Sequence, residues 1–517
     1  MFEDRSFFAS GRSGILENRI PYPSVLDPAS EDYANVFGGL PDITRALWNF
    51  SSSENHFIEA GEDLLIIPDM SAIVQRPRNL IRVIKEIRKR YGYSKLIYAQ
   101  GFSDPYLIPV LVYLGISFFD NTQAILEGAD GIRYTPFGRI RNGEDNSESN
   151  SEYVSEIARF CGLALEGGKL RELVERATVS SRAVEILRLS DDVLYNQVES
   201  GFPRYTPSII AGSIESLNRP DLRRFRSYIS EEYKHQYDGQ IALLIPCTAR
   251  KPYSTSRTHQ RLLRALGNRR KNLHEIIVTS PVGLVPRDLE RTYPPAFYDI
   301  PVTGQWYLEE QRMINSMLEH YFSRNHYRRV IAFIDESLEF IRDHLPQESE
   351  IIFWNKHSGD SEFDLLLSSI DSEKNEQKQQ KRNTRLEEFI SIAKYQFGDW
   401  IVPYVSSSRI IRNYDRDMLV YDGKPALVFH EDRGMFSITR HAAQWFIENS
   451  KFLVEIDDFK PTANIYAVGI KGASQEIRPG DEVVLHHSGD VRGVGIAKMP
   501  VEAMTSLRKG VAVKVRN

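Results

Sequence analysis

Short apolar runs alternate with amphipathic stretches in the first quarter of the chain. Leu64–Ile67, Lys95–Gln100 and Ile116–Phe119 are apolar runs of strand length. Leu80–Tyr91 and Tyr106–Leu114, which lie between them, have the spacing of helices. This alternation is typical of β/α units around a parallel sheet. An acidic loop over residues 144–152 and a helical stretch over 153–200 are expected to follow.

The same alternation returns in the middle of the chain. The strands and helices expected there are, in order, Ile241–Pro246, Ser256–Leu266, Glu275–Thr279, Tyr307–Phe322, Val330–Ile334 and Ile351–Trp354. A second parallel sheet is therefore predicted.

The pattern becomes β-rich towards the C-terminus. Residues 371–384 are almost all charged or amide-bearing, which indicates a linker or the exposed start of a helix. Turn signals follow at Asp422-Gly423, Asp432–Gly434 and Ser488–Asp490. A compact unit of short strands and glycine-containing turns runs from about Phe459 to the end.

Length and composition narrow the class of protein. A chain of 517 residues, 41% of them hydrophobic and 26% charged, has enough apolar side chains for several cores and predicts three or four domains. No apolar run approaches the roughly 18 residues of a membrane span, and the first twenty residues lack the apolar core of a signal peptide. We therefore expect a cytoplasmic protein without a membrane segment. The only two cysteines, Cys161 and Cys247, exclude a disulfide framework and a four-cysteine zinc site.

The net charge of -5 hides two basic segments. Residues 250–272 contain eight Lys or Arg and no acid, and Arg508, Lys509, Lys514 and Arg516 lie close to the C-terminus. Local basic surfaces of this kind bind phosphates whatever the overall charge. Each could equally be a solvated helix face or strand face.

The segment from Pro246 to His259 carries the strongest chemical signal. Cys247 follows an apolar strand, at the edge of a parallel sheet where open α/β proteins bind ligands. Ser254 or Ser256 can cap the next helix, whose N-terminus favours an anion or a thiolate. Lys251 acts in the same direction, because nearby positive charge lowers the pKa of a thiol. The alternative is that Cys247 is a small buried apolar residue.

This segment resembles the signature of the archaeosine synthases, relatives of the archaeal tRNA-guanine transglycosylases. The pattern Pro-Cys-x3-Lys-Pro-Tyr-x2-Ser-x2-His is matched at every specified position, namely Pro246, Cys247, Lys251, Pro252, Tyr253, Ser256 and His259. The resemblance implies a tRNA substrate with 7-cyano-7-deazaguanine in its D-arm, whose nitrile receives the amine of free lysine. It also implies a radical S-adenosylmethionine partner enzyme that cleaves the adduct to archaeosine. No metal or other cofactor is expected for the lysine step.

The resemblance also suggests roles for the signature residues. Cys247 either attacks the nitrile to form a thioimidate or leaves direct attack to lysine. His259 is expected to shuttle protons, Tyr253 or Ser256 to donate one, and Lys251 to act electrostatically or on phosphate. Substrate contacts are expected at Pro246, Ser254, Ser280, Arg287, Gly304, Gln305 and Trp306.

The C-terminal unit resembles the PUA domain, a small RNA-binding β-barrel. The matching pieces are Ile465–Ile470, Gly480–Val483 and Gly493–Ala497, followed by a short helix and a basic strand. The alternative is an unrelated small barrel, since any such fold needs glycines at tight corners. RNA contacts across the chain are expected at Arg261, Arg264, Arg492, Gly493, Arg508 and Lys509.

The N-terminal region resembles the later half of a tRNA-guanine transglycosylase barrel. The matching pieces are Pro68–Met70, Gly101–Pro105, Leu114–Ile116, Phe119–Asn121 and Arg133–Gly138. The family nucleophile falls on Asp120, which could equally be a cap or turn residue. The base-binding Asp-Ser-Gly-Gly-Phe segment and the zinc cysteines of that family are absent, so we expect a shortened barrel kept for architecture or RNA docking.

Together these patterns predict an α/β multidomain protein. The expected domains are a truncated TIM-barrel-like domain (1–200), a central α/β domain with a parallel sheet (201–370), an α+β pre-PUA domain (371–457) and a PUA β-barrel (458–517). A base-exchanging transglycosylase and a non-catalytic tRNA-binding subunit are the rival functions. A homodimer is an open alternative for the assembly.

Overall fold

The computed structural model describes residues 1–17, 19–31, 33–34, 56–176, 179–235, 240–354, 361–372, 384–413 and 416–516. They form two compact units. One comprises Met1–Thr206 together with Phe446–Asn517, and the other comprises Pro207–Trp445. No helix among the residues described combines the length and apolarity needed to cross a bilayer.

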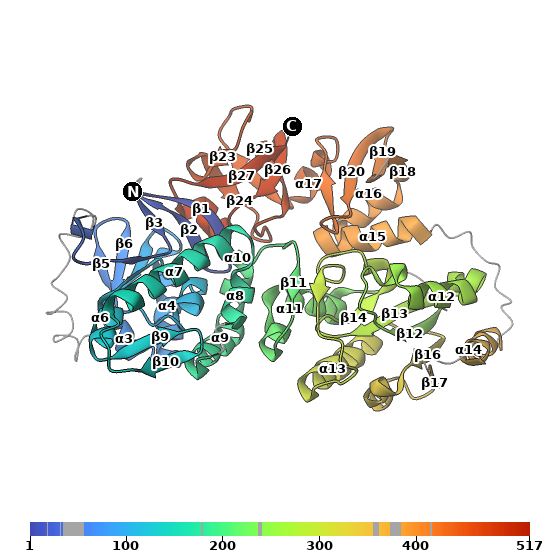
Figure 1. Ribbon diagram of the computed structural model, residues 1–517. Coiled ribbons are helices and arrows are strands. Elements are labelled where there is room, and N and C mark those ends of the chain that lie inside the picture. The colour runs from blue at the N-terminus through green and yellow to red at the C-terminus, as the bar shows by residue number, and fades with distance from the viewer. Residues whose placement is uncertain are drawn as a thin grey trace. The chain divides into compact units, whose positions relative to one another are not determined.

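The first unit contains a five-stranded sheet (Figure 1). Its order is β4 (Ser24–Leu26), β8 (Phe118–Asp120), β7 (Leu96–Ala99), β6 (Leu64–Ile67) and β5 (Ile58–Ala60), linked by helices α3 (Met70–Ile73), α4 (Pro77–Tyr91) and α5 (Ile108–Tyr113). The first four strands are parallel and β5 is antiparallel. A closed TIM barrel has eight parallel strands. Within the described residues the sheet is open, so the fold is mixed α/β and the barrel-like detail stays a prediction.

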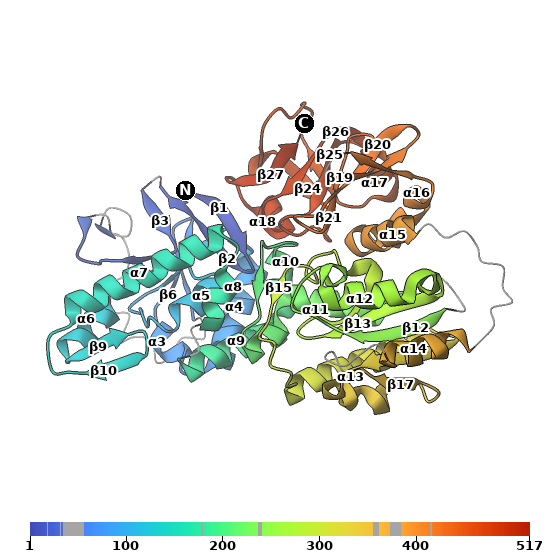
Figure 2. The same cartoon turned by 45° about the vertical axis from the view of Figure 1, so that its right-hand side comes forward.

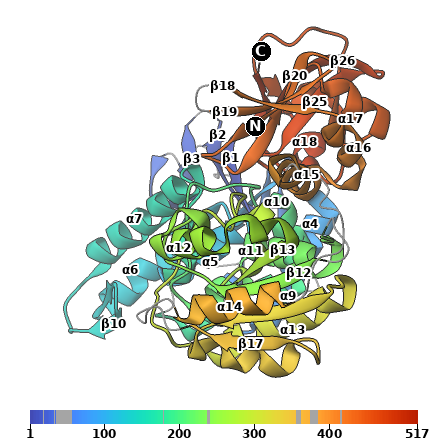
Figure 3. The same ribbon diagram turned by 90° about the vertical axis from the view of Figure 1, so that its right-hand side faces the viewer.

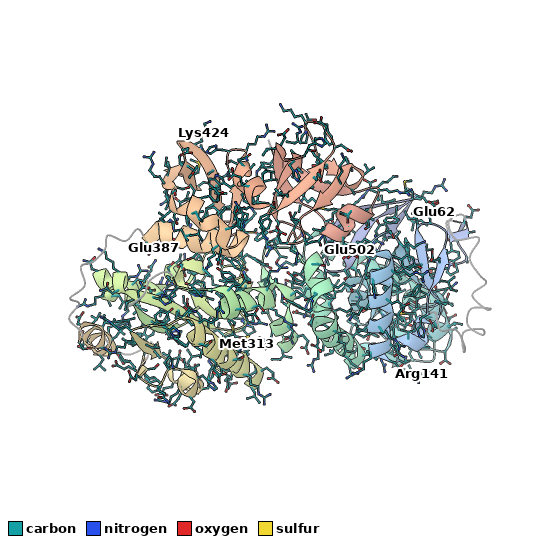
Figure 4. The ribbon with its side chains drawn as sticks, turned by 180° about the vertical axis from the view of Figure 1, so that it is seen from behind. Glu62, Arg141, Met313, Glu387, Lys424 and Glu502 are labelled. Carbon is teal, nitrogen blue, oxygen red and sulfur yellow. The ribbon has the colours of Figure 1, made fainter. Side chains whose placement is uncertain are left out.

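Helices and small sheets complete this part of the chain. They are β1 (Phe2–Phe8), β2 (Gly11–Leu16), β3 (Ile20–Tyr22), α6 (Thr122–Ala129), β9 (Ile132–Thr135), β10 (Gly138–Arg141, with Arg141 labelled in Figure 4), α7 (Ser147–Glu166), α8 (Leu170–Arg176), α9 (Ser181–Val193) and α10 (Tyr195–Gly201). The acidic stretch predicted as a loop is wrong from Ser147 onward. The start of α7 is polar, but buried Asn150 accepts a hydrogen bond from Tyr134 N and donates one to Ile132 O, both 2.8 Å long. These bonds fix the first turn of α7 where apolar packing gives no signal.

The second unit is built on a five-stranded sheet. Its order is β14 (Gly283–Pro286), β13 (Leu273–Thr279), β12 (Ile241–Pro246), β16 (Arg329–Ile334) and β17 (Glu350–Phe353). Strands β13, β12, β16 and β17 are parallel, as predicted, and β14 is antiparallel. Helix α12 (Arg257–Leu266) covers one face and α13 (Leu308–Arg324) the other (Figure 2).

The order of these strands creates a switch point. From β12 the chain moves to β13 on one side and later returns to β16 on the other. Open α/β sheets bind ligands at such a point, beyond the carboxyl ends of the strands. Helix α14 (Ser361–Asp371) contacts β17 and α12 at the far edge (Figure 3).

A separate antiparallel sheet completes the second unit. Its strands are β18 (Arg409–Asn413), β19 (Arg416–Tyr421), β20 (Lys424–His430) and β21 (Met435–Ile438), with helices α15 (Thr384–Phe397) and α16 (Val402–Ser406) beside it. Asp422 and Gly423 form the predicted hairpin turn with φ of 46° and 76°. Lys424 lies beside this turn (Figure 4). Most of the predicted linker, 373–383, lies outside the described residues. Shorter elements are α11 (Pro220–Ser227), β11 (Ile209–Ile210), β15 (Tyr298–Asp299) and α17 (Ala443–Asn449).

The C-terminal part of the first unit is a six-stranded sheet. Its order is β23 (Ile465–Tyr466), β27 (Val511–Arg516), β26 (Asp490–Ala497), β25 (Glu482–His487), β22 (Leu453–Ile456) and β24 (Ile470–Ala473), with helix α18 (Val501–Ser506) beside it. The expected strand 465–470 is interrupted by a 3-10 turn at Ala467–Gly469. Two ion pairs tie this sheet to the rest of its unit, Arg204 to Asp481 at 2.8 Å and Arg478 to Glu199 at 2.9 Å.

Candidate active site

Four parallel strands of the second unit end in polar or aromatic residues that line one cavity. Cys247, Ser280, Asp335 and Trp354 are the first residues after β12, β13, β16 and β17. The cavity has a volume of about 620 Å³, within the range of small-molecule sites. Because parallel strands end at the same edge of a sheet, residues more than a hundred positions apart in the chain meet here.

The loop between β15 and α13 forms much of the remaining wall. The other lining residues are Pro246, Thr248, Ile300, Pro301, Val302, Thr303, Gly304, Gln305, Trp306, Glu310, Glu336, Ser337, Leu338 and Phe353. Of the expected substrate contacts, the structure brings Pro246, Ser280, Gly304, Gln305 and Trp306 to the cavity. The acidic residues Glu310, Asp335 and Glu336 give it negative charge.

Sequence reasoning missed Asp335, Glu336 and Trp354. Asp335 directly follows the buried strand β16, the same signal that singled out Cys247, and Trp354 directly follows the more exposed strand β17. Trp354 was expected to be the last residue of its strand. Its ring stacks on Phe333 with centroids 5.0 Å apart, and its Nε1 is buried without a hydrogen-bond partner among the described residues.

Cys247 is half-buried and lies within electrostatic reach of Lys251. The Cys247 amide donates to Val278 O at 3.2 Å, which joins the end of β12 to β13. The Lys251 ammonium lies 3.8 Å from the centre of the Tyr298 ring and donates to Ala249 O at 3.3 Å. Burial lowers the pKa of Lys251, and a thiolate on Cys247 opposes that shift. The ammonium and the thiolate therefore stabilise each other, as the motif suggested.

Ser256 and His259 act on the backbone rather than on the cavity. The Ser256 hydroxyl caps α12, accepting from His259 N at 3.2 Å as predicted. The buried His259 ring pairs through Nε2 with Pro246 O at 2.9 Å and through Nδ1 with an Arg287 guanidinium nitrogen at 2.9 Å. A carbonyl only accepts and a guanidinium only donates, so Nε2 carries the proton and Nδ1 does not.

His259 is consequently neutral, and each of its ring nitrogens is engaged in a hydrogen bond. Burial and the adjacent Arg287 lower its pKa to about 4. It does not line the cavity and holds the carbonyl of Pro246, the residue before Cys247. Both ring nitrogens are engaged in this geometry, so the expected role as a proton shuttle stays a prediction that the geometry does not favour.

Tyr253 does not line the cavity either. Its buried hydroxyl lies 2.8 Å from Tyr298 Oη, which in turn lies 2.5 Å from Thr279 Oγ1. Tyr253 and Ser256 were the expected proton donors, but both are committed to contacts beneath the loop. Neither residue lines the cavity, but Tyr253 lies close enough to Cys247 that a thiolate there, after burial, raises the pKa of the Tyr253 phenol.

Arg287 and Ser254 line a different cavity, of about 550 Å³. Arg287 forms 2.7 Å ion pairs with Glu275 and Glu290, and Ser254 N donates to Glu290 at 3.0 Å. The structure therefore does not bring Arg287 and Ser254 to the cavity that Cys247 lines. These ion pairs already neutralise Arg287, Glu275 and Glu290, and no thiol lines this second cavity, so the cavity of Cys247 is the better candidate.

The residues expected to contact RNA are scattered. In the second unit, Arg261 packs on the Phe363 ring and Arg264 donates to Gln260 O. In the PUA domain, Arg492 forms an ion pair with Asp458 and Gly493 is buried in β26. Lys509 is half-buried and Arg508 is exposed. Within the basic stretch, Arg269 pairs with Asp371 and Arg270 with Glu275. Ion pairs thus neutralise part of that charge.

Asp120, the position of the family nucleophile in the first unit, is fully buried. One carboxylate oxygen accepts from Tyr98 Oη at 2.7 Å and Gly101 N at 2.5 Å, and the other accepts from Thr122 N at 3.0 Å. These bonds hold the ends of β7 and β8 together.

Comparison with known proteins adds a family context. A domain of unknown function, DUF5591, matches residues 222–365, and the PUA domain matches residues 458–517. Archaeosine synthase subunit alpha of Thermoplasma acidophilum is 47% identical over 100% of both chains. The proteins of the same name from Methanosarcina acetivorans and Thermococcus kodakarensis are 29% and 30% identical, over 88% of this chain and 79% and 80% of theirs.

Proposed function

The chain belongs to the archaeosine synthase family and carries a C-terminal PUA domain, and we propose that it is a tRNA-modifying enzyme of archaeosine biosynthesis. Its substrate is tRNA that carries 7-cyano-7-deazaguanine in the D-arm. The enzyme adds free lysine to the nitrile, and a radical S-adenosylmethionine partner cleaves the adduct. The name "subunit alpha" that its relatives carry supports a second subunit.

One observation carries the proposal, the cavity at the switch point of the second unit. It joins a half-buried thiol, aromatic walls from Trp306, Phe353 and Trp354, and the carboxylates of Asp335 and Glu336. Aromatic walls suit a nucleobase taken out of its stack. Carboxylates suit a cationic amine donor. A nitrile carbon needs a nucleophile, which Cys247 supplies next to the Lys251 ammonium.

In the proposed reaction Cys247 attacks the nitrile carbon and lysine then displaces it. His259 is a positioning residue, since it holds Pro246 O and contacts no cavity. Base exchange is the weaker proposal, because the Asp120 carboxylate is fully buried and already accepts three hydrogen bonds.

Mass spectrometry of tRNA tests the proposal. Nitrile-bearing tRNA is incubated with the full chain, with and without lysine, and then digested to nucleosides. The expected result is a nucleoside heavier by one lysine, formed only when lysine is present. Release of the free base would favour the transglycosylase, and unchanged tRNA would favour a non-catalytic binding subunit.

A further inference from the structure

Ser280 has a buried hydroxyl without a partner. The residue is 4% exposed, and its Oγ has no hydrogen-bond partner among the described residues. A buried hydroxyl that makes no hydrogen bond costs folding free energy, and where it lines a cavity a bound ligand completes the bond. Ser280 lines the cavity of Cys247, and the Cys247 amide bonds to Val278 O, two residues before Ser280.

The other hydroxyl groups of the cavity are already committed. Thr248 Oγ1 donates to Arg250 O at 3.2 Å, and Thr303 Oγ1 accepts from Gln305 N at 3.3 Å. Ser337 Oγ accepts from Trp306 Nε1 at 3.1 Å and also bonds to Asp335. Among the described residues, Ser280 therefore has the one hydroxyl on this wall that is buried and unoccupied.

Attack of the Cys247 sulfur on a nitrile requires a hydrogen-bond donor in the cavity. As sulfur bonds to the nitrile carbon, negative charge develops on the nitrile nitrogen, and a donor fixed beside that nitrogen lowers the barrier. His259, Tyr253 and Ser256 do not line the cavity. Lys251 does not line it either and holds Ala249 O.

We propose that Ser280 is a catalytic residue whose hydroxyl binds the nitrile nitrogen and relays to it the proton released by Cys247. This rests on the proposed function. In the first step the Cys247 S–H bond breaks and an S–C bond forms. The thiol proton passes to Ser280 Oγ as the Ser280 proton passes to nitrogen, which gives a neutral thioimidate.

The second step reverses the relay. The neutral amine of the donor attacks the thioimidate carbon, the C–S bond breaks, and an amidine remains on the base. One amine proton returns through Ser280 to the sulfur, which regenerates the thiol. Atoms and electrons balance without an oxidant, a reductant or a nucleotide.

The test compares the Ser280→Ala variant with a matched control in single-turnover reactions of nitrile-bearing tRNA. Ser117→Ala removes another fully buried hydroxyl that is unpaired among the described residues, in the other unit. Ser280→Ala is expected to slow both the Cys247 adduct and the lysine product by roughly a hundredfold, the usual effect of removing one such donor. The KM values for tRNA and lysine should stay within about threefold, because ground-state binding is preserved. Ser280→Thr, which keeps a hydroxyl, should recover part of the rate.

The outcomes separate this inference from the proposed function. If the wild-type chain forms no adduct and no lysine product, the function itself is wrong. If the wild type reacts and Ser280→Ala reacts within about threefold of it, only the role of Ser280 is overturned. Equal losses in Ser117→Ala and Ser280→Ala would also overturn it, because a general packing defect would then explain both.

Discussion

At the scale of single residues, the two cysteines of the chain occupy opposite environments. Cys161 is buried in α7, and burial raises the pKa of its thiol. Cys247 is half-buried, lines a cavity and has the Lys251 ammonium nearby. A thiol-directed reagent near neutral pH should therefore label Cys247 first. Peptide mass spectrometry measures the order of labelling, and nitrile-bearing tRNA should protect Cys247.

The same reagent offers an internal control. Lys251→Met should slow the labelling of Cys247 and leave Cys161 unaffected.

Cys247→Ala should abolish lysine addition. If this variant still adds lysine at the wild-type rate, direct attack by lysine replaces the covalent route.

His259 makes stability depend on pH. Its pKa of about 4 lies below the ordinary 6.5, because burial and Arg287 disfavour the charged ring. The imidazole therefore binds a proton more readily in the unfolded chain than in the folded one. The contribution of neutral His259 to the free energy of unfolding is complete above pH 6.5 and is lost as the pH falls towards 4. The loss amounts to about 3 kcal/mol in the free energy of unfolding.

Urea denaturation at several pH values checks this prediction. His259→Gln, which keeps a donor for Pro246 O, should remove most of the acid-side decline. His320→Gln changes an exposed histidine and should retain the decline. A decline of the same size in wild type and His259→Gln would count against it.

Local pattern predicts some of these residues well. The capping role of Ser256 and the strand-end position of Cys247 follow from a few neighbouring residues. The partners of His259 do not, because Arg287 is 28 positions away and the tautomer depends on what each partner can donate. Local sequence therefore predicts where these side chains lie in the chain, but it does not predict which protein groups engage the ring of His259.

At the scale of elements, apolar runs in the sequence predict the positions of the buried strands reliably. Strand β12 coincides with its prediction because all six of its residues are buried. The polar start of α7 was misread, since Asn150 is held by hydrogen bonds that no periodicity reveals. Asp335 and Trp354 were missed because the order of strands in the sheet, which decides what meets Cys247, is set by nonlocal pairing.

Asp120 joins the ends of β7 and β8, and its replacement should affect stability rather than chemistry. In Asp120→Asn an amide would face three donors that now bond to a carboxylate. We expect a loss of roughly 1–3 kcal/mol in unfolding free energy and nearly unchanged lysine addition. Denaturant titration and the tRNA assay measure the two. A folded variant with a loss of activity beyond about a hundredfold would restore the transglycosylase reading.

At the scale of the whole molecule, tRNA binding should depend on basic residues that make no part of the cavity. Arg508 and Lys509 precede the closing strand of the PUA domain. Their double replacement by Ala should weaken tRNA binding and reduce its salt dependence by about one power of salt concentration per lost phosphate contact. Filter binding at several salt concentrations measures both.

Lys424→Ala is the control for this experiment, since Lys424 lies exposed beside a hairpin turn in the other unit. If Lys424→Ala and the double replacement of Arg508 and Lys509 weaken tRNA binding equally, the effect reflects nonspecific charge alone. Point changes are preferable to deletion of the domain, because Arg204 pairs with Asp481 inside the first unit. This partnership joins residues 277 positions apart, and local patterns do not reveal it.

The spacing of the strand ends at the cavity also sets the length of amine donor that fits. Cys247, Asp335 and Trp354 follow three neighbouring strands, so each lies roughly 4.8 Å from the next along the edge of the sheet. An amine donor whose charged end is held at Asp335 must reach back across one strand spacing to the carbon bound by Cys247. Ornithine, shorter than lysine by one methylene, should therefore be used about 10- to 200-fold less efficiently. Competition between the two amino acids for nitrile-bearing tRNA measures this ratio, and equal use would show that the sheet does not set the reach.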